Sequence, residues 1–334
     1  MVQTGGHKPV MVKEVLAALS PQDGGIYIDG TFGAGGYSRA ILEAAQCKVY
    51  GIDRDPDVKS QASDLEQQFA GRLSVLTGRF SEMNRLLSTQ GVTAVQGVAL
   101  DLGVSSMQLD QAERGFSFRA DGPLDMRMEK AGPTAADVVN GTSESELADI
   151  IYKYGEERAS RRIAKAIVEA RREQPFTRTL QLAETVRSVM PRNRDGIDPA
   201  TRTFQALRIY VNDELGEIDR GLSSAEKIIE PGGHLAVVSF HSLEDRKVKE
   251  FLRLRSGTSG KTSRHLPDQE TASPAPTFRL LRRRATKPTA AEVAVNPRSR
   301  SARFRAAERL DAPSWPGDDQ DGERYHNSGN RRAA

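Results

Sequence analysis

Short apolar runs alternate with amphipathic segments over the first third of the chain. Four of the runs have the length and apolar character of buried strands: residues 26–29, 49–53, 73–76 and 96–101. Strands separated by helices predict a parallel sheet with helices on both faces. Three of the runs end in an acid, at Asp29, Asp53 and Asp101. Such sheets bind ligands beyond the carboxyl ends of their strands, so the pattern predicts these carboxylates at a ligand site.

The pattern changes after Ser106, where apolar residues begin to recur every three or four positions. This period predicts helices near residues 143–154, 156–172 and 180–189. Ser143 and Glu146 have the spacing of a capping box at the start of the first one. A longer helix is predicted from an N-cap at Asp198 through Leu222, and the strand pattern resumes at residues 235–240. We therefore expect an all-helical domain inserted into an α/β domain.

The predicted organisation has an α/β domain in two parts, a helical insertion and a tail. The α/β domain comprises residues 1–108 and 209–310, and the insertion comprises residues 109–208. Residues 256–277 are rich in Ser, Thr, Pro and Gly and poor in apolar side chains, which predicts a mobile loop. Residues 311–334 are predicted to form a disordered tail.

Composition excludes several classes of protein. The 334-residue chain has one cysteine, Cys47, so an intrachain disulfide framework is excluded, as expected in a reducing cytoplasm. Its longest apolar run, residues 235–240, is far short of the roughly 20 residues of a membrane span, and residues 1–10 lack the apolar core of a signal peptide. No two of the five histidines stand three or four positions apart, so a local zinc motif is absent. We expect a cytoplasmic protein with neither a membrane partner nor a metal.

The net charge of +3 is unevenly distributed. Residues 278–309 contain nine arginines and one lysine against two glutamates, a net charge of +8, which leaves −5 on the rest of the chain. A basic block on a mildly acidic body indicates a polyanionic partner, most often a nucleic acid. A solvated, positively charged segment would give the same pattern.

A glycine-rich turn follows the first predicted strand and opens a helix, in the order Asp29-Gly30-Thr31-Phe32-Gly33-Ala34-Gly35-Gly36. Glycine permits positive φ and lets a ligand approach the backbone closely. The dinucleotide pattern G-x-G-x-x-G does not fit, because the third position counted from Gly33 and Gly35 is Ser38. The absence of that pattern disfavours NAD as the cofactor, and it therefore also disfavours a dehydrogenase as the class of enzyme.

The acids beside this turn point to a cationic ligand that carries a ribose. Asp29 would attract a sulfonium or ammonium group and would repel a phosphate. Asp53, at the end of the second strand, can accept hydrogen bonds from two ribose hydroxyls. These features favour S-adenosylmethionine, with Asp29, Gly33, Gly35, Gly36 and Asp53 as candidate contacts.

Several longer motifs occur in the order found in one family. They are residues 7–10 (HKPV), 27–36 (YIDGTFGAGG), 51–56 (GIDRDP), 100–110 (LDLGVSSMQLD), 115–118 (GFSF), 239–246 (SFHSLEDR) and 296–302 (NPRSRSA). In these motifs the chain closely resembles the bacterial 16S rRNA (cytosine-N4)-methyltransferases, the RsmH or MraW family, over about residues 7–310. The resemblance implies a class I (Rossmann-like) methyltransferase fold with a helical insertion. It also implies methylation of the exocyclic N4 amine of a cytidine in the decoding centre (P-site region) of 16S rRNA, with the small ribosomal subunit as partner.

The resemblance also implies which residues contact S-adenosylmethionine. Carried onto matching positions, they are Gly35, Gly36, Tyr37, Asp53, Phe80, Asp101 and Gln108. The residue after Gly36 is usually His in this family and is Tyr37 here, so a contact that needs an imidazole would be lost and a backbone contact would survive. Phe80 follows the third strand and could pack on the adenine or belong to the core.

Methyl transfer to a cytosine amine needs acceptors for the amine hydrogens and an in-line geometry. Asp101, at the end of the fourth strand, suits either this role or cofactor contact. The turn after the fifth strand supplies Phe240, which could stack a flipped base, and His241 and Ser242, which could hydrogen-bond it. Methylation at C5 would need a cysteine nucleophile, and Cys47 stands at the amino end of the second strand, away from the predicted site.

The candidate RNA contacts lie in the basic block: Arg282, Arg283, Arg284, Arg298 and Arg300. Arg298 and Arg300 could instead be exposed charges on a final strand. Two other functions stay open at this point. The chain could methylate another RNA or DNA atom, or it could be an rRNA-binding ribosome-assembly factor that uses the cofactor only structurally.

Overall fold

A seven-stranded sheet forms one lobe of the computed structural model, which describes residues 9–191, 196–258 and 274–316. The strands have the order β3-β2-β1-β4-β5-β7-β6. Their bounds are β1 Ile26–Asp29, β2 Lys48–Asp53, β3 Leu73–Thr77, β4 Val95–Asp101, β5 Ile229–Ser239, β6 Phe278–Leu280 and β7 Arg303–Arg309. β1 to β5 are parallel, and β7 is antiparallel to both β5 and β6. The predicted parallel sheet is confirmed, with an antiparallel edge added by the C-terminal segment.

Helices cover both faces because alternate residues of each strand point to opposite sides. On one face Tyr27 and Ala99 join a core with α1 (Val12–Leu19), α2 (Gly36–Ala44) and α3 (Asp57–Gln68). On the other face their neighbours Ile28 and Leu100 join a core with α4 (Met83–Ser88), α11 (Glu214–Ile228) and α12 (Ser242–Arg255). The predicted helices on both faces of the sheet are therefore observed.

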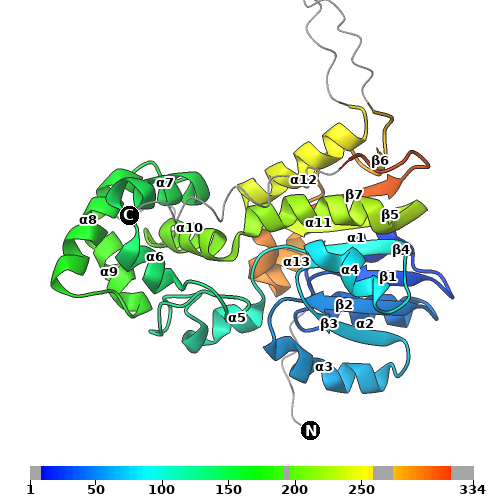
Figure 1. Cartoon of the computed structure of the whole chain (residues 1–334), viewed down its shortest axis with the longest axis horizontal. Coiled ribbons are helices and arrows are strands. Elements are labelled where there is room, and N and C mark those ends of the chain that lie inside the picture. Colours follow the sequence, from blue (N-terminus) through cyan, green and yellow to red (C-terminus); the bar gives the residue numbers. More distant parts are fainter. Residues whose placement is uncertain (1–8, 192–195, 259–273, 317–334) are drawn as a thin grey trace, which may run out of the picture.

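The second lobe is a helical insertion between β4 and β5, seen on the left of Figure 1. Its helices are α6 Ala135–Gly141, α7 Glu144–Gly155, α8 Ser160–Glu173, α9 Thr179–Val189 and α10 Thr201–Asn212. Their apolar faces form a core of their own, which includes Leu147, Ile163 and Leu207. The remaining elements of the described residues are short. They are η1 Phe80–Glu82, α5 Ser106–Asp110, η2 Ala112–Arg114, α13 Ala290–Val295 and η3 Pro297–Ser301. Among the described residues no helix is both long and apolar enough to cross a membrane.

The prediction of a single long helix from Asp198 through Leu222 is wrong, because the chain forms two helices there, α10 and α11. Asp213 has φ 47°, a left-handed conformation that ends α10 and redirects the chain into α11. The apolar spacing continues across this break, since both helices bury a face. Periodicity alone therefore could not reveal that one helix belongs to the insertion and the other to the sheet.

Residues 311–316, predicted as the start of a disordered tail, are held against the sheet lobe instead. The indole N–H of Trp315 donates to the Ala275 carbonyl (2.9 Å), and the Arg255 guanidinium lies 4.2 Å from the indole centroid. Thr277, in the predicted mobile loop, is buried and its N–H donates to the Arg255 carbonyl (2.8 Å). Residues 259–273 of that loop and 317–334 of the tail lie outside the described residues.

Segments far apart in the sequence meet at the carboxyl edge of the sheet. The Met11 N–H donates to Glu292 Oε1 (2.6 Å), which joins the start of α1 to α13. The two lobes are joined by Glu129, which pairs with both Arg54 and Arg79. They are also joined at the amino end of α12, where Ser242 and Arg246 both bond Glu156 at the end of α7. These contacts fix the insertion over the edge of the sheet.

Asn212, at the end of α10, is the buried polar residue that ties this junction together. Its Nδ2 donates to the carbonyls of Met126 (2.7 Å) and Arg208 (2.8 Å), and its Oδ1 accepts from the Met128 N–H (2.8 Å). Replacing Asn212 with Ala would leave the Met126 carbonyl and the Met128 N–H unpaired. We predict a loss of about 2–4 kcal/mol in the free energy of unfolding, measured by urea denaturation.

The matched control is Asn84→Ala, which removes one half-buried hydrogen bond to the Ser224 carbonyl. It should cost about 1 kcal/mol. Equal losses in the two variants would contradict the special role of Asn212.

Candidate active site

A cavity of about 410 Å³ lies at the carboxyl ends of β1, β2, β4 and β5, beneath the insertion. The predicted site residues that line it are Asp29, Gly33, Gly36, Tyr37, Asp53, Phe80, Asp101, Gln108, Phe240, His241 and Arg298. Gly35, Ser242, Arg282, Arg283, Arg284 and Arg300 are not among its lining residues. Residues from both lobes and from the C-terminal segment therefore meet at one cavity.

The glycine-rich turn connects β1 to α2 and forms the floor of the cavity. Gly33 and Gly35 have φ of 52° and 73°, which L side chains rarely adopt. A Cβ on Gly35 would lie 2.6 Å from Leu65 and 2.8 Å from Phe32, so this glycine serves close packing behind the turn. Gly36 opens α2 and lies against Pro9, where a Cβ would lie 2.8 Å from the proline ring.

Asp29 ends β1 and is almost completely buried. Its Oδ2 accepts from the N–H (3.0 Å) and the hydroxyl (2.8 Å) of Ser38, which ties the strand to α2. Its Oδ1 is buried without a hydrogen-bond partner. Burial raises the pKa of Asp29 to about 6, against a lowering by the Ser38 hydrogen bonds. The carboxyl group therefore ionises near neutral pH, and its negative charge would favour a cationic ligand nearby.

Asp53 ends β2 and orders the turn that faces it. Its Oδ2 accepts from the Gly33 N–H (2.8 Å) and its Oδ1 from the Asp55 N–H (2.9 Å). Burial raises the pKa of this carboxyl group, and the two backbone hydrogen bonds oppose the rise. Each carboxylate oxygen has a second lone pair, so the side chain can still accept from two hydroxyls.

Three other predicted cofactor contacts have structural partners of their own. The Tyr37 hydroxyl donates to the Val10 carbonyl (2.6 Å), so the residue in place of the usual His holds the segment before α1 over the turn. The Gln108 Nε2 donates to Asp55 Oδ2 (2.9 Å), and its Oε1 accepts from the Ser105 N–H (3.1 Å).

Phe80, the third of these, follows β3 at the start of η1. A Cβ on Gly221 of α11 would lie 2.0 Å from its ring, so that glycine admits the ring. Phe80 packs partly in the core and also lines the cavity. The two predicted roles, core packing and contact with an adenine, are therefore compatible.

Asp101 lies at the centre of the cavity wall, where β4 ends. Its N–H donates to Thr31 Oγ1 (2.6 Å), while its Oδ1 is buried without a hydrogen-bond partner. Burial raises the pKa of Asp101 well above its ordinary value, and the charges of Asp29 and Glu244 raise it further. The ionisation of Asp101 is therefore opposed by two other acids, Asp29 on β1 and Glu244 on α12.

The amino end of α12 forms the wall beyond Asp101. Phe240 and His241 line the cavity, and His241 Nδ1 accepts from the Glu244 N–H (3.4 Å) as the N-cap of the helix. Ser242 is exposed and its hydroxyl donates to Glu156 of the insertion. The structure thus separates Ser242 from Phe240 and His241, with which it was predicted to act.

Glu244 is a cavity residue that the sequence reasoning missed. It stands in the motif quoted above, three positions after His241, where an acid is also expected as an ordinary helix-capping residue. Its side chain is fully buried and lines the cavity. Only the fold shows that it faces the same space as Asp101.

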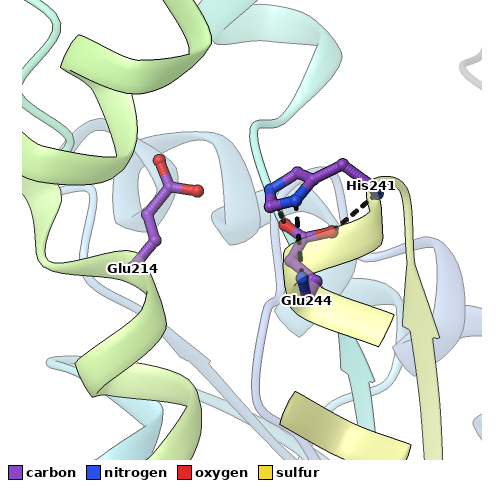
Figure 2. Close-up of side chains that lie close together, drawn as sticks. All are labelled: Glu214, His241 and Glu244. Atoms are coloured by element: carbon purple, nitrogen blue, oxygen red, sulfur yellow. Dashed lines mark hydrogen bonds and ion pairs between the residues drawn. The ribbon is translucent and has the colours of Figure 1, made fainter. Parts of the chain in front are cut away.

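Glu214, His241 and Glu244 each place a possible metal-ligand atom within 4.8 Å of the others (Figure 2). Arg208 lies among them: its guanidinium makes two bonds to Glu214 (2.7 and 2.9 Å) and lies 3.4 Å from His241 Nε2. Burial lowers the pKa of Arg208, but Glu214 and Glu244 raise it more. A fixed positive charge of the protein thus supplies the charge that a metal ion would bring.

The chemistry of the cavity agrees with S-adenosylmethionine. Two buried carboxyl oxygens, on Asp29 and Asp101, have no partner and would be compensated by a sulfonium and an ammonium group. Asp53 offers acceptors for ribose hydroxyls, and Phe80 offers an apolar wall. The donor set and the charges therefore match this ligand.

The strand order, the glycine-rich turn after β1 and the acids at the ends of β1, β2 and β4 define a class I S-adenosylmethionine-dependent methyltransferase. The chain belongs to the MraW methylase family, whose model matches residues 4–310.

Relatives of high identity support this assignment. The chain is 63% identical over 309 residues to the ribosomal RNA small subunit methyltransferase H of Paramagnetospirillum magneticum, covering 92% of this chain and 97% of that protein. It is 59% identical to the protein of the same name from Rhodospirillum rubrum, covering 92% and 96%. Among solved structures, an rRNA methylase from Streptococcus thermophilus aligns with a TM-score of 0.37 and 10% identity, over 91% of this chain and 98% of that one.

Replacing Asp29 with Asn is expected to stabilise the ligand-free protein. Since the pKa of Asp29 is raised from 3.8 to about 6, its contribution to stability is present below about pH 4 and is lost as pH rises through about 6. Asn stays neutral, and its oxygen can still accept from Ser38. Urea denaturation should show a gain of about 2–3 kcal/mol at about pH 8 and almost none near pH 4.

The same variant should bind S-adenosylmethionine more weakly at about pH 8, because an ionised acceptor for a cation is lost. Calorimetry measures this affinity, with exposed Asp64→Asn as the control that should change neither property. A stability gain that is independent of pH would contradict the assignment.

Proposed function

We propose that this chain transfers a methyl group from S-adenosylmethionine to the exocyclic N4 amine of a cytidine in the decoding centre (P-site region) of 16S rRNA, acting on the small ribosomal subunit in the cytoplasm. Membership of the MraW methylase family and the high identity to small-subunit rRNA methyltransferases support an rRNA substrate. The observation that carries the proposal is the Asp101 carboxyl group, whose Oδ1 has no hydrogen-bond partner and which lies between the cofactor residues and Phe240.

The bound cofactor would supply an electrophilic methyl group. Gly33, Asp53 and Phe80 would hold it, with Asp29 opposite its positive charge. Asp101 would orient either the cofactor or the target amine, and Phe240 offers an aromatic face for an extruded base. The protein's contribution is mainly positioning, since an in-line displacement depends on the alignment of the reacting atoms.

Methylation of cytosine C5 is disfavoured by the position of the cysteine. Cys47 is buried just before β2, at the amino edge of the sheet, and its thiol donates to the Ile41 carbonyl (3.6 Å). Burial raises the pKa of this thiol, which reduces its nucleophilic thiolate form. The N4 amine needs no covalent nucleophile, so it agrees better with the cavity.

The decisive experiment incubates the protein and a labelled methyl donor with small subunits from a strain that lacks the gene. Mass spectrometry of the digested rRNA should find N4-methylcytidine at a single decoding-centre position. Asp101→Asn should keep the fold and reduce transfer by about 100-fold or more, because a carboxylate acceptor becomes partly a donor.

Label at C5, at a ribose hydroxyl or in another RNA would overturn the proposal. Full binding of subunits without any transfer by the wild-type protein would favour the assembly-factor alternative.

The basic C-terminal segment is proposed to hold the RNA. Arg282, Arg283 and Arg284 are exposed between β6 and α13, and exposed Arg300 follows Arg298, which lines the cavity and pairs with Asp110 (2.5 Å). Phosphate contacts need charge more than a fixed side-chain direction, so three consecutive arginines can all contribute.

Replacing Arg282, Arg283 and Arg284 with Ala should weaken binding to small subunits and flatten its salt dependence by about 1–3 units of slope. The control removes three exposed positive charges that do not line the cavity, at Lys48, Arg85 and Lys227. Filter binding at several salt concentrations measures both. An equal effect of the two triple variants would mean that net charge alone acts, with the helical insertion as the main RNA-binding candidate.

A further inference from the structure

Glu244 combines complete burial with an oxygen that has no hydrogen bond. Its Oε2 accepts from the N–H groups of Phe240 (2.7 Å) and His241 (3.2 Å), so this oxygen is used by the backbone. Its Oε1 is buried and accepts no hydrogen bond, although it lies 3.0 Å from His241 Nε2, within ion-pair distance. Figure 2 shows the carboxylate held against the imidazole at the start of α12. The imidazole lies on one side of this oxygen, and a carboxylate oxygen has a second lone pair that a ligand could use.

Glu244 borders the part of the cavity that lies beyond the cofactor residues. A Cβ on Gly103 would lie 3.5 Å from Glu244 Oε1 and 3.9 Å from the Phe240 ring, so this glycine, two positions after Asp101, borders the same space. Asp29, Asp53 and the glycine-rich turn lie on the β1 and β2 side, whereas Phe240 and Glu244 follow β5. Asp101 lies between the two groups, because β4 pairs with both β1 and β5.

We propose that Glu244 is a catalytic residue whose Oε1 accepts a hydrogen from the N4 amine of the target cytosine, opposite Asp101 and beside the Phe240 ring. This assignment rests on the proposed function. It adds a residue to that reaction and gives a reason why the site would take cytosine. Cytosine carries two hydrogens on N4, so a site that selects it needs an acceptor at this position.

The charge of Glu244 suits an amine edge, which needs an acceptor. Burial would raise the pKa of Glu244, but His241 and Arg208 lower it more, so the group is ionised and can only accept. The pKa of Asp101 shifts in the opposite direction, since burial and the charges of Asp29 and Glu244 raise it well above its ordinary value. Uracil has the reverse pattern, an N3 hydrogen and an O4 acceptor, and would place acceptor against acceptor at Glu244.

The proton balance of the transfer is then complete. The lone pair of N4 forms the bond to the methyl carbon, the carbon–sulfur bond breaks with its electron pair left on sulfur, and one N4 proton passes to Oε1 of Glu244. The products are an N4-methylated cytosine, the demethylated thioether and a neutral Glu244 side chain. A weak base suffices because N4 becomes strongly acidic once it has a fourth substituent.

Glu244→Gln separates this chemistry from helix capping. The amide oxygen can still accept from Phe240 and His241, while the amide nitrogen presents hydrogens where the acceptor stood. The control is Glu226→Gln, another fully buried glutamate, which pairs with Arg255 outside the cavity. Both proteins are tested as the full chain, with the melting temperature and the affinity for S-adenosylhomocysteine measured first. The melting temperature of Glu244→Gln should match that of the wild type. Its affinity for S-adenosylhomocysteine should lie within about threefold of the wild-type value.

The first readout is the single-turnover rate on small subunits from the deletion strain. Glu244→Gln should lower it by about 100-fold or more, the usual contribution of a positioned base, and Glu226→Gln should leave it unchanged. The second readout is equilibrium binding, without methyl donor, to subunits that carry cytidine or uridine at the methylated position. Wild type should prefer cytidine by about tenfold, and Glu244→Gln should lose that preference.

An unchanged rate in a folded Glu244→Gln protein, or equal binding of both subunits by the wild type, would overturn the assignment of Glu244. If the wild type methylates a different atom, the proposed function fails and this assignment fails with it. If the wild type methylates N4 and Glu244→Gln does so at the same rate, only the role of Glu244 fails.

Discussion

Like-charged carboxyl groups buried around one cavity are the constraint on which the rest of the structure depends. Asp29, Asp101 and Glu244 approach from three different elements, and each has an oxygen without a hydrogen bond. Such groups would repel one another and favour hydration, so the surrounding fold must hold them in place. Ser38, Thr31 and the two N–H groups just before α12 bind the other polar atoms of these residues, which leaves one carboxyl oxygen of each without a hydrogen bond.

The helical insertion extends this arrangement from the sheet to a second lobe. Arg208 and Glu214 lie on either side of the break between α10 and α11, and both line the cavity. The insertion is therefore part of the cavity wall, because its last helix supplies charge there. The Glu156 bonds to Ser242 and Arg246 join the same lobe to the helix that carries Glu244.

Most of the sheet was predictable because its strands are buried on both faces and end in acids with a fixed spacing from the glycine-rich turn. The break at Asp213 was not, because apolar periodicity is the same on both sides of a left-handed residue. Tyr37 and Gln108 were named as cofactor contacts, but their hydrogen bonds to Val10 and Asp55 depend on tertiary contacts that sequence spacing does not encode. Glu244 was missed for a related reason, since a capping glutamate and a ligand-facing glutamate occupy the same position in the sequence.

The bond between Met11 and Glu292 has a consequence for how the protein is made. It closes a loop of 281 positions beside the cavity, so the segment that carries Met11 leaves the ribosome long before its partner in α13. Domains generally fold as units during synthesis, and long-range closure comes late. A nascent chain that has completed β1 to β4 would therefore hold a glycine-rich turn and its acids without a finished cavity, and competence for methyl transfer would arise only after α13 has been made.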